Sequence, residues 1–151
     1  MSELHSSYPL TLDWTEGKQG VLHAPGGLPD LEVASPPEFD GPGGRWTPEH
    51  LFVAAAAACW MTTFRSMVTL SRVETAAITV AAEGFLEKGD DRLYSIPRLV
   101  LQPHVVLRRE EDRERAARLI RKAEEVCLVA RSMRATVELE FEISVAPAEA
   151  A

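Results

Sequence analysis

The longest uninterrupted signal in the chain runs over residues 45–71 and predicts a central core helix. Every residue of 51–58 is apolar, and a helix that is apolar all round is a buried one. Thr47 before Pro48 is typical of an N-cap followed by proline at the first helical position. Arg65 and several hydroxyl side chains interrupt the run, so we expect a core helix and not a membrane span.

Alternating apolar and polar residues before this helix predict three short strands, over residues 8–14, 20–23 and 31–34. Turn residues separate them, so we expect a meander whose first strand is half buried. The segment 35–44 is dense in proline and glycine. It is predicted to be a loop, a kind of segment that often carries function on a rigid scaffold.

After the helix, two long strands are predicted over residues 77–87 and 93–107, joined by a hairpin turn at 88–91. Pro97 and Pro103 fall in the return strand. Because proline cannot donate to a strand ladder, we expect this strand to be interrupted or to lie at a sheet edge.

The rest of the chain predicts a second helix and a last strand. The helix is predicted to begin with the acidic residues Glu110, Glu111 and Asp112. Its apolar positions follow i, i+3, i+4 spacing, which places Cys127 on the inward face. Residues 136–145 alternate as one strand. The order of elements predicts an α+β domain with antiparallel sheets.

Length and charge limit the function classes. The chain has 151 residues and 46% hydrophobic content, so we expect a single domain over 1–151 with flexible tails at 1–7 and 147–151. A net charge of −7 argues against nucleic-acid binding. The first ten residues lack a signal-peptide pattern, so we expect a cytoplasmic protein without membrane association.

A helix that is apolar on every side is hard to enclose within so short a chain. One sheet can cover one side of it, and a second copy of the chain could cover the other. We therefore expect an obligate homodimer with the Cys59 helix near its interface.

Cys59 and Cys127 are the only cysteines and do not have the spacing of a zinc site. On composition alone, two buried inert thiols are the more common case. The alternative is a redox pair, in which one thiolate attacks a peroxide and the other cysteine traps the sulfenic acid as a disulfide. This requires Cα atoms within about 7 Å.

Three segments together resemble the OsmC/Ohr family of osmotically inducible and organic hydroperoxide resistance proteins. The first is TPEHLFVAAAAACWMTTF, with a Pro-Glu start, a run of small residues and a cysteine. The second is AEEVCLVARSM, which corresponds to the second-cysteine helix. The third is the loop ending in EFDGPGG. The resemblance covers about residues 8–145.

The resemblance implies an intertwined homodimer of OsmC-like fold, with antiparallel sheets around two cysteine-bearing helices, that reduces hydrophobic organic hydroperoxides in oxidative-stress defence. Cys59 would be the peroxidatic cysteine and Cys127 the resolving one, and Glu49 would orient a catalytic arginine. A dithiol such as a lipoyl group or a small thiol would supply electrons, and no metal or organic cofactor is implied.

The chain departs from the family pattern in two places. Glu38 stands where OsmC-type members carry arginine, and an acid there would raise the pKa of a neighbouring thiol. Arg45 is the candidate substitute. The family usually has a proline directly after the second cysteine, whereas residues 128–130 of this chain predict an unbroken helix through Cys127. A non-catalytic small-molecule-binding or scaffold dimer is therefore the alternative function.

Glu49 and Cys59 are ten residues apart, about 15 Å along a straight helix. Either the helix breaks between them, or the site combines residues of both subunits. The candidate lining of a hydrophobic substrate pocket consists of Phe39, Trp46, Trp60 and Phe64, although the two tryptophans also suit a packing role.

Overall fold

The computed structural model describes residues 5–148, and the chain forms two compact units that meet within the first helix. The first unit extends to Leu51 and the second begins at Phe52. The sequence predicts one domain, whereas the contacts fall into two groups because the three N-terminal strands form a sheet of their own. Parts of both predicted tails, 1–4 and 149–151, lie outside the described residues.

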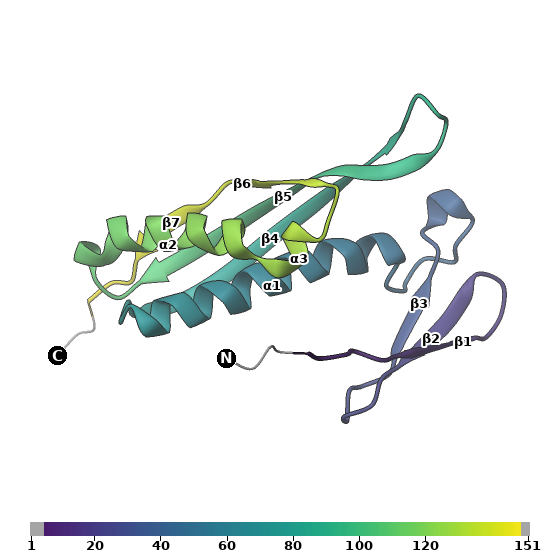
Figure 1. Ribbon diagram of the computed structural model, residues 1–151, viewed down its shortest axis with the longest axis horizontal. Helices are drawn as coiled ribbons and strands as arrows, with labels where there is room; N and C mark the ends of the chain where they lie inside the picture. Colours follow the sequence, from purple (N-terminus) through teal and green to yellow (C-terminus); the bar gives the residue numbers. More distant parts are fainter. Residues whose placement is uncertain (1–4, 149–151) are drawn as a thin grey trace. The chain divides into compact units, whose positions relative to one another are not determined.

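The first unit is a three-stranded antiparallel meander of β1 (Thr11–Trp14), β2 (Gln19–His23) and β3 (Leu31–Ala34) (Figure 1). This confirms the predicted strands. The prediction that the first strand is half buried is wrong, since Leu12 is 57% exposed and Trp14 is 74% exposed. The reason is that β2 pairs with the edge of β1 but does not cover its faces.

The proline- and glycine-rich loop is tightly tied to its own unit. It contains a 3₁₀ turn over Pro37–Phe39, and the Lys18 ammonium donates to the Phe39 carbonyl at 2.7 Å. A Cβ on Gly41 would lie 1.5 Å from the Ser35 carbonyl oxygen, so only glycine fits there. The loop leads to Thr47, whose hydroxyl accepts the His50 backbone N–H at 3.1 Å, which confirms the predicted N-cap of α1 (Pro48–Leu70).

The second unit is built on a mixed sheet. Its strands are β4 (Thr75–Lys88), β5 (Tyr94–Leu107), β6 (Thr136–Leu139) and β7 (Glu142–Val145). β4 and β5 are antiparallel as predicted, but β6 and β7 both run parallel to β5. Purely antiparallel pairing is therefore wrong, because the helical segment after β5 returns the chain along the sheet before β6 begins.

β5 is not interrupted, and from Arg98 onward it lies between β4 on one side and β6 and β7 on the other. The expectation drawn from its two prolines is therefore wrong for Pro103. Pro103 is tolerated because β6 ends opposite Leu101 and β7 begins opposite His104, so the missing N–H falls in the gap between them. Pro97 lies at an irregularity of the β4–β5 ladder and before the first residue paired with β6. The same gap divides the single last strand predicted from the sequence.

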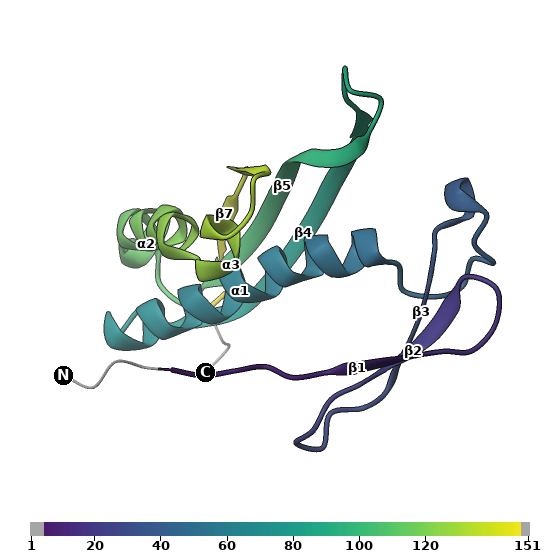
Figure 2. The same cartoon turned by 45° about the vertical axis from the view of Figure 1, so that its right-hand side comes forward.

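The helices α1 and α2 (Arg113–Val126) pack on one face of this sheet (Figure 1, Figure 2). Four buried residues at i, i+4 spacing hold α1 to β5 and α2, namely Ala56, Trp60, Phe64 and Val68. The opposite face of α1 is exposed at Ala55, Ala58 and Thr62. The prediction of a helix buried on every side is therefore wrong for the single chain, since one sheet and one helix cover only one face.

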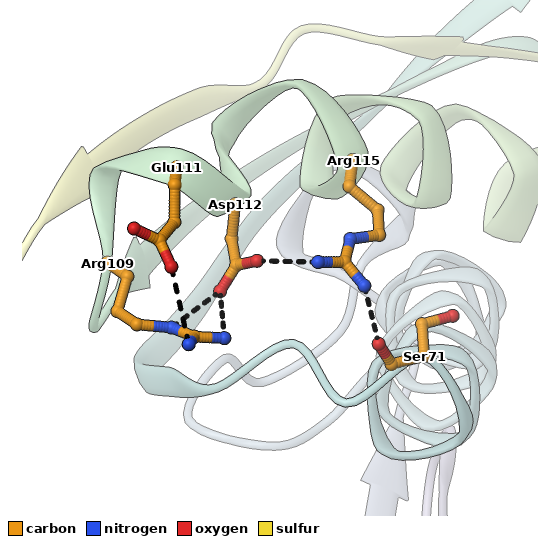
Figure 3. A network of polar contacts seen from close by, with 5 residues as sticks. All are labelled: Ser71, Arg109, Glu111, Asp112 and Arg115. Carbon is orange, nitrogen blue, oxygen red and sulfur yellow. Dashed lines mark hydrogen bonds and ion pairs between the residues drawn. The ribbon is translucent and has the colours of Figure 1, made fainter.

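A buried carboxylate ties the start of α2 to the end of α1 (Figure 3). Asp112 is fully buried and accepts from Arg109 at 3.2 Å and from Arg115 at 2.9 Å. Arg115 also donates to the Ser71 carbonyl at 2.9 Å. The acidic start predicted for the second helix is present as a 3₁₀ turn over Glu110–Asp112. One of its carboxylates thus has a structural role beyond the helix dipole.

Candidate functional site

The two cysteines come together within the second unit. Cys59 lies midway along α1, and Cys127 lies at the junction of α2 and the short helix α3 (Leu128–Arg131). The Cys127 thiol lies close enough to the Cys59 sulfur to influence its pKa, and the Thr63 hydroxyl lies 4.0 Å from that sulfur. Both thiols are free; Cys127 is buried and Cys59 is partly exposed. This arrangement places a second sulfur next to an accessible one.

The second helix breaks at Cys127, so the prediction that residues 128–130 continue it is wrong. Cys127 has φ −58° and ψ 113°, and its N–H bonds the Glu124 carbonyl in a tightened last turn. The N–H groups of Leu128 and Val129, which would bond carbonyls of a continuous helix, instead lie close enough to the Cys59 sulfur to lower its pKa. A contact with Cys59 on α1 stabilises the break, and the sequence around Cys127 contains no glycine or proline that would indicate it.

The environment separates the pKa values of the two thiols. Burial raises the pKa of Cys59, but the Val129 N–H, the Cys127 thiol, the Thr63 hydroxyl and the Leu128 N–H outweigh it and lower that pKa below the ordinary value. Burial raises the pKa of Cys127, and the neighbouring Cys59 raises it further. Cys59 is therefore the more acidic thiol of the pair and Cys127 the less acidic one.

This difference predicts the pH dependence of alkylation. Because its pKa is lowered, Cys59 should react with iodoacetamide with a midpoint at lower pH than an ordinary cysteine. Cys127→Ala removes one donor, so the Cys59 pKa should rise and alkylation at pH 7 should slow by about two- to fivefold. Ser66→Ala, on the exposed side of the same helix, is the control and should leave the rate unchanged. A midpoint at or above that of free cysteine would contradict the assignment.

The aromatic residues expected near Cys59 are part of the core. Trp60 and Phe64 are fully buried and stacked, with ring centroids 5.0 Å apart. The Trp60 indole donates to the Ile120 carbonyl at 3.2 Å. Neither side chain reaches the surface of the chain, so both hold α1 against α2.

The remaining predicted residues belong to the first unit. The Arg45 guanidinium pairs with Glu32 at 3.1 Å, and Glu38 is exposed. Gly44, Arg45, Trp46 and His50 line an open hollow of about 310 Å³, while Phe39 is half-buried in the loop.

Glu49 has an unusual environment in that unit, because its Oε2 atom is buried and has no hydrogen-bond partner among the described residues. A buried carboxylate oxygen without a donor is costly. α1 is continuous from Pro48 to Leu70, so a helix break between Glu49 and Cys59 is excluded.

Two further features of the chain concern membranes and metal ions. α1 is long and apolar enough to cross a membrane by composition, but its buried residues pack on β5 and α2 as in a core helix. Among residues 5–148, no three side chains of the His, Cys, Asp or Glu types lie close enough together to hold a metal ion.

Comparison with known proteins identifies the family. The family model described as OsmC-like protein matches residues 41–142, which include the Pro-Glu start of α1 and both cysteines. The chain belongs to the OsmC-like family. An OsmC-like protein of unknown function from Vibrio cholerae has a structure with a TM-score of 0.83, at 21% identity over 91% of this chain and 99% of that one. This confirms the OsmC-like α+β fold.

Two curated relatives align over most of their length. The uncharacterized protein YmaD of Bacillus subtilis is 28% identical over 141 residues, which cover 90% of this OsmC-like chain and 92% of YmaD. The organic hydroperoxide resistance protein-like 1 of Staphylococcus epidermidis is 24% identical, over 85% of this chain and 89% of the relative. Organic hydroperoxide resistance is thus associated with the family.

Sequence reasoning missed three groups at the sulfur of this OsmC-like protein. The spacing of Cys59 and Thr63, four residues apart on one helix, could have indicated the hydroxyl contact. The amides of Leu128 and Val129 had no such signal, because backbone donors carry no residue signature.

Proposed function

We propose that this protein reduces organic hydroperoxides with Cys59 as the peroxidatic cysteine and Cys127 as the resolving cysteine. The observation that carries the proposal is the proximity of the Cys127 thiol to the Cys59 sulfur, together with the neighbouring amides and the Thr63 hydroxyl that lower the pKa of Cys59. A thiolate is the nucleophile that attacks a peroxide, and a second thiol beside it is positioned to trap the product.

The chemistry balances in two steps. The Cys59 thiolate attacks the distal peroxide oxygen of ROOH, the O–O bond breaks, and the alkoxide takes a proton to leave as ROH. Cys59 is then a sulfenic acid, two electrons more oxidised. The Cys127 sulfur attacks it, a disulfide forms and water leaves with the thiol proton. An external dithiol, such as a lipoyl group or a small thiol, returns two electrons.

The rest of the site extends the proposal. We infer a homodimer in which a second copy covers the exposed face of α1, with the site combining residues of both subunits. Glu49, whose buried oxygen lacks a donor, then orients a cation, with Arg45 as the candidate. Phe39 and Trp46 line the entry of a hydrophobic peroxide, while Trp60 and Phe64 support it from the core. A cytoplasmic location suits reduced thiols.

Counting thiols tests the function directly. Reduced protein mixed with cumene hydroperoxide should lose both thiols within minutes as one disulfide within the chain, a mass change of about two hydrogens. The measurement is intact mass spectrometry with and without a thiol-alkylating reagent, and untreated protein is the control. Retention of both thiols would overturn the proposal.

The second candidate function is a non-catalytic small-molecule-binding or scaffold dimer. It is favoured by Glu38 at the position where OsmC-type relatives carry arginine, and by the pairing of Arg45 with Glu32. Such a protein would keep both thiols under the same peroxide treatment, so the one experiment separates the two functions.

A further inference from the structure

A cavity beside the β4–β5 hairpin is separate from both cysteines. It has a volume of about 660 Å³, within the usual range for ligand sites. One wall is the hairpin segment 89–97, and the other is Arg134 and Ala135, just before β6. Figure 1 shows the hairpin continuing past the start of β6.

The cavity contains an open strand edge. β6 pairs with β5 only from Arg98 onward, where Arg98 lies opposite Thr136. Along Tyr94–Pro97, no described strand lies on the β6 side of β5. Such an edge presents backbone N–H and C=O groups that can pair with an added strand. The segment spans about 13 Å, the length of an extended tetrapeptide.

Opposite charges without partners stand at the two ends of this edge. Among the described residues, Arg134 and Asp90 have no hydrogen bond or ion pair. Arg134 lies where β6 begins, and Asp90 lies at the hairpin turn with Asp91, whose Oδ1 accepts the Leu93 N–H. The apolar side chains of Leu93 and Ile96 lie between the two ends.

We propose that this cavity binds the carboxyl-terminal segment of an extended peptide, added as a strand to β5 in line with β6. The peptide runs parallel to β5, its terminal carboxylate pairs with Arg134, and a cation about three residues earlier meets Asp90. Charge complementarity and the length of the open edge select this occupant. The cation is either a free amino terminus or a lysine side chain.

Peptide titration followed by NMR tests the proposal. The probe is acetyl-Lys-Val-Thr-Val with a free terminal carboxylate, and it is compared with the same peptide ending in a carboxamide. A third peptide, Ala-Val-Thr-Val with a free amino terminus, tests whether that terminus can replace the lysine side chain as the cation. The acid should bind at least about tenfold more tightly than the amide, because a charge-assisted bond is lost. Arg134→Gln should abolish that difference, while Arg131→Gln, an exposed arginine outside the cavity, should preserve it.

Asp90→Asn should weaken the lysine peptide and leave acetyl-Ala-Val-Thr-Val unaffected. Equal binding of acid and amide, or preference for the acid in Arg134→Gln, overturns the proposal. Absence of saturable binding up to about 10 mM also overturns it, including the case where a second copy of the chain fills the cavity. None of these results depends on the cysteines, so the peroxide assay is an independent test.

Discussion

Cys59→Ser should abolish hydroperoxide consumption, lowering the second-order rate constant by about a thousandfold or more. The serine hydroxyl keeps the shape of the side chain but is not ionised at neutral pH, so no nucleophile remains. The measurement is loss of cumene hydroperoxide under excess dithiol. Consumption at the wild-type rate would assign the chemistry to another group.

Cys127→Ser is the matched variant, because it keeps a hydroxyl donor beside Cys59 but cannot form the disulfide. One equivalent of peroxide should still be consumed, and Cys59 should stop as a sulfenic acid that dimedone traps. Further peroxide should overoxidise it to the sulfinic acid. A disulfide detected in this variant could only be intermolecular, and repeated turnover through it at the wild-type rate would refute resolution within one chain.

Asp112→Ala should destabilise the second unit by about 2–3 kcal/mol, the second large effect that we expect. The Asp112 carboxylate is fully buried and forms ion pairs with both Arg109 and Arg115 (Figure 3). Its loss leaves two guanidinium groups without their shared acceptor and releases the link through Arg115 to Ser71. Both arginines are about half exposed and can be hydrated, which limits the cost. Urea unfolding followed by circular dichroism measures it.

Glu111→Ala is the control for this change, since it removes an adjacent carboxylate that also pairs with Arg109. Glu111 is 73% exposed and its ion pair measures 3.4 Å, so its loss should cost no more than about 0.5 kcal/mol. Equal destabilisation by the two variants would contradict the importance of burial at Asp112.

The predicted elements agree with the structure where the signal is local. Thr47 before Pro48 marks the start of α1, and the turn around Lys88–Asp91 marks the hairpin between β4 and β5. Caps, turns and hydrophobic periods depend on residues within a few positions, so the sequence alone determines them. The family resemblance, now confirmed, also depended on such short segments.

Predictions failed where a distant partner decides the outcome. The direction of β6 follows from the path of the chain over the sheet, and the tolerance of Pro103 follows from a gap between two neighbouring strands. The exposed strand β1 and the open face of α1 have an apolar pattern that indicates burial, but no described element of its own unit covers either of them. Apolar character is local, whereas the surface that covers it is not.

The cysteine pair illustrates both cases. The sequence by itself determined that there are two thiols on apolar positions, with Cys59 on the first helix and Cys127 near the end of the second helical segment. Only the tertiary structure decided that the second helix breaks at Cys127 and that the amides of Leu128 and Val129 lie where they lower the pKa of Cys59. The physical reason is that a backbone donor is available at every residue, and its acceptor is selected by how the helices pack.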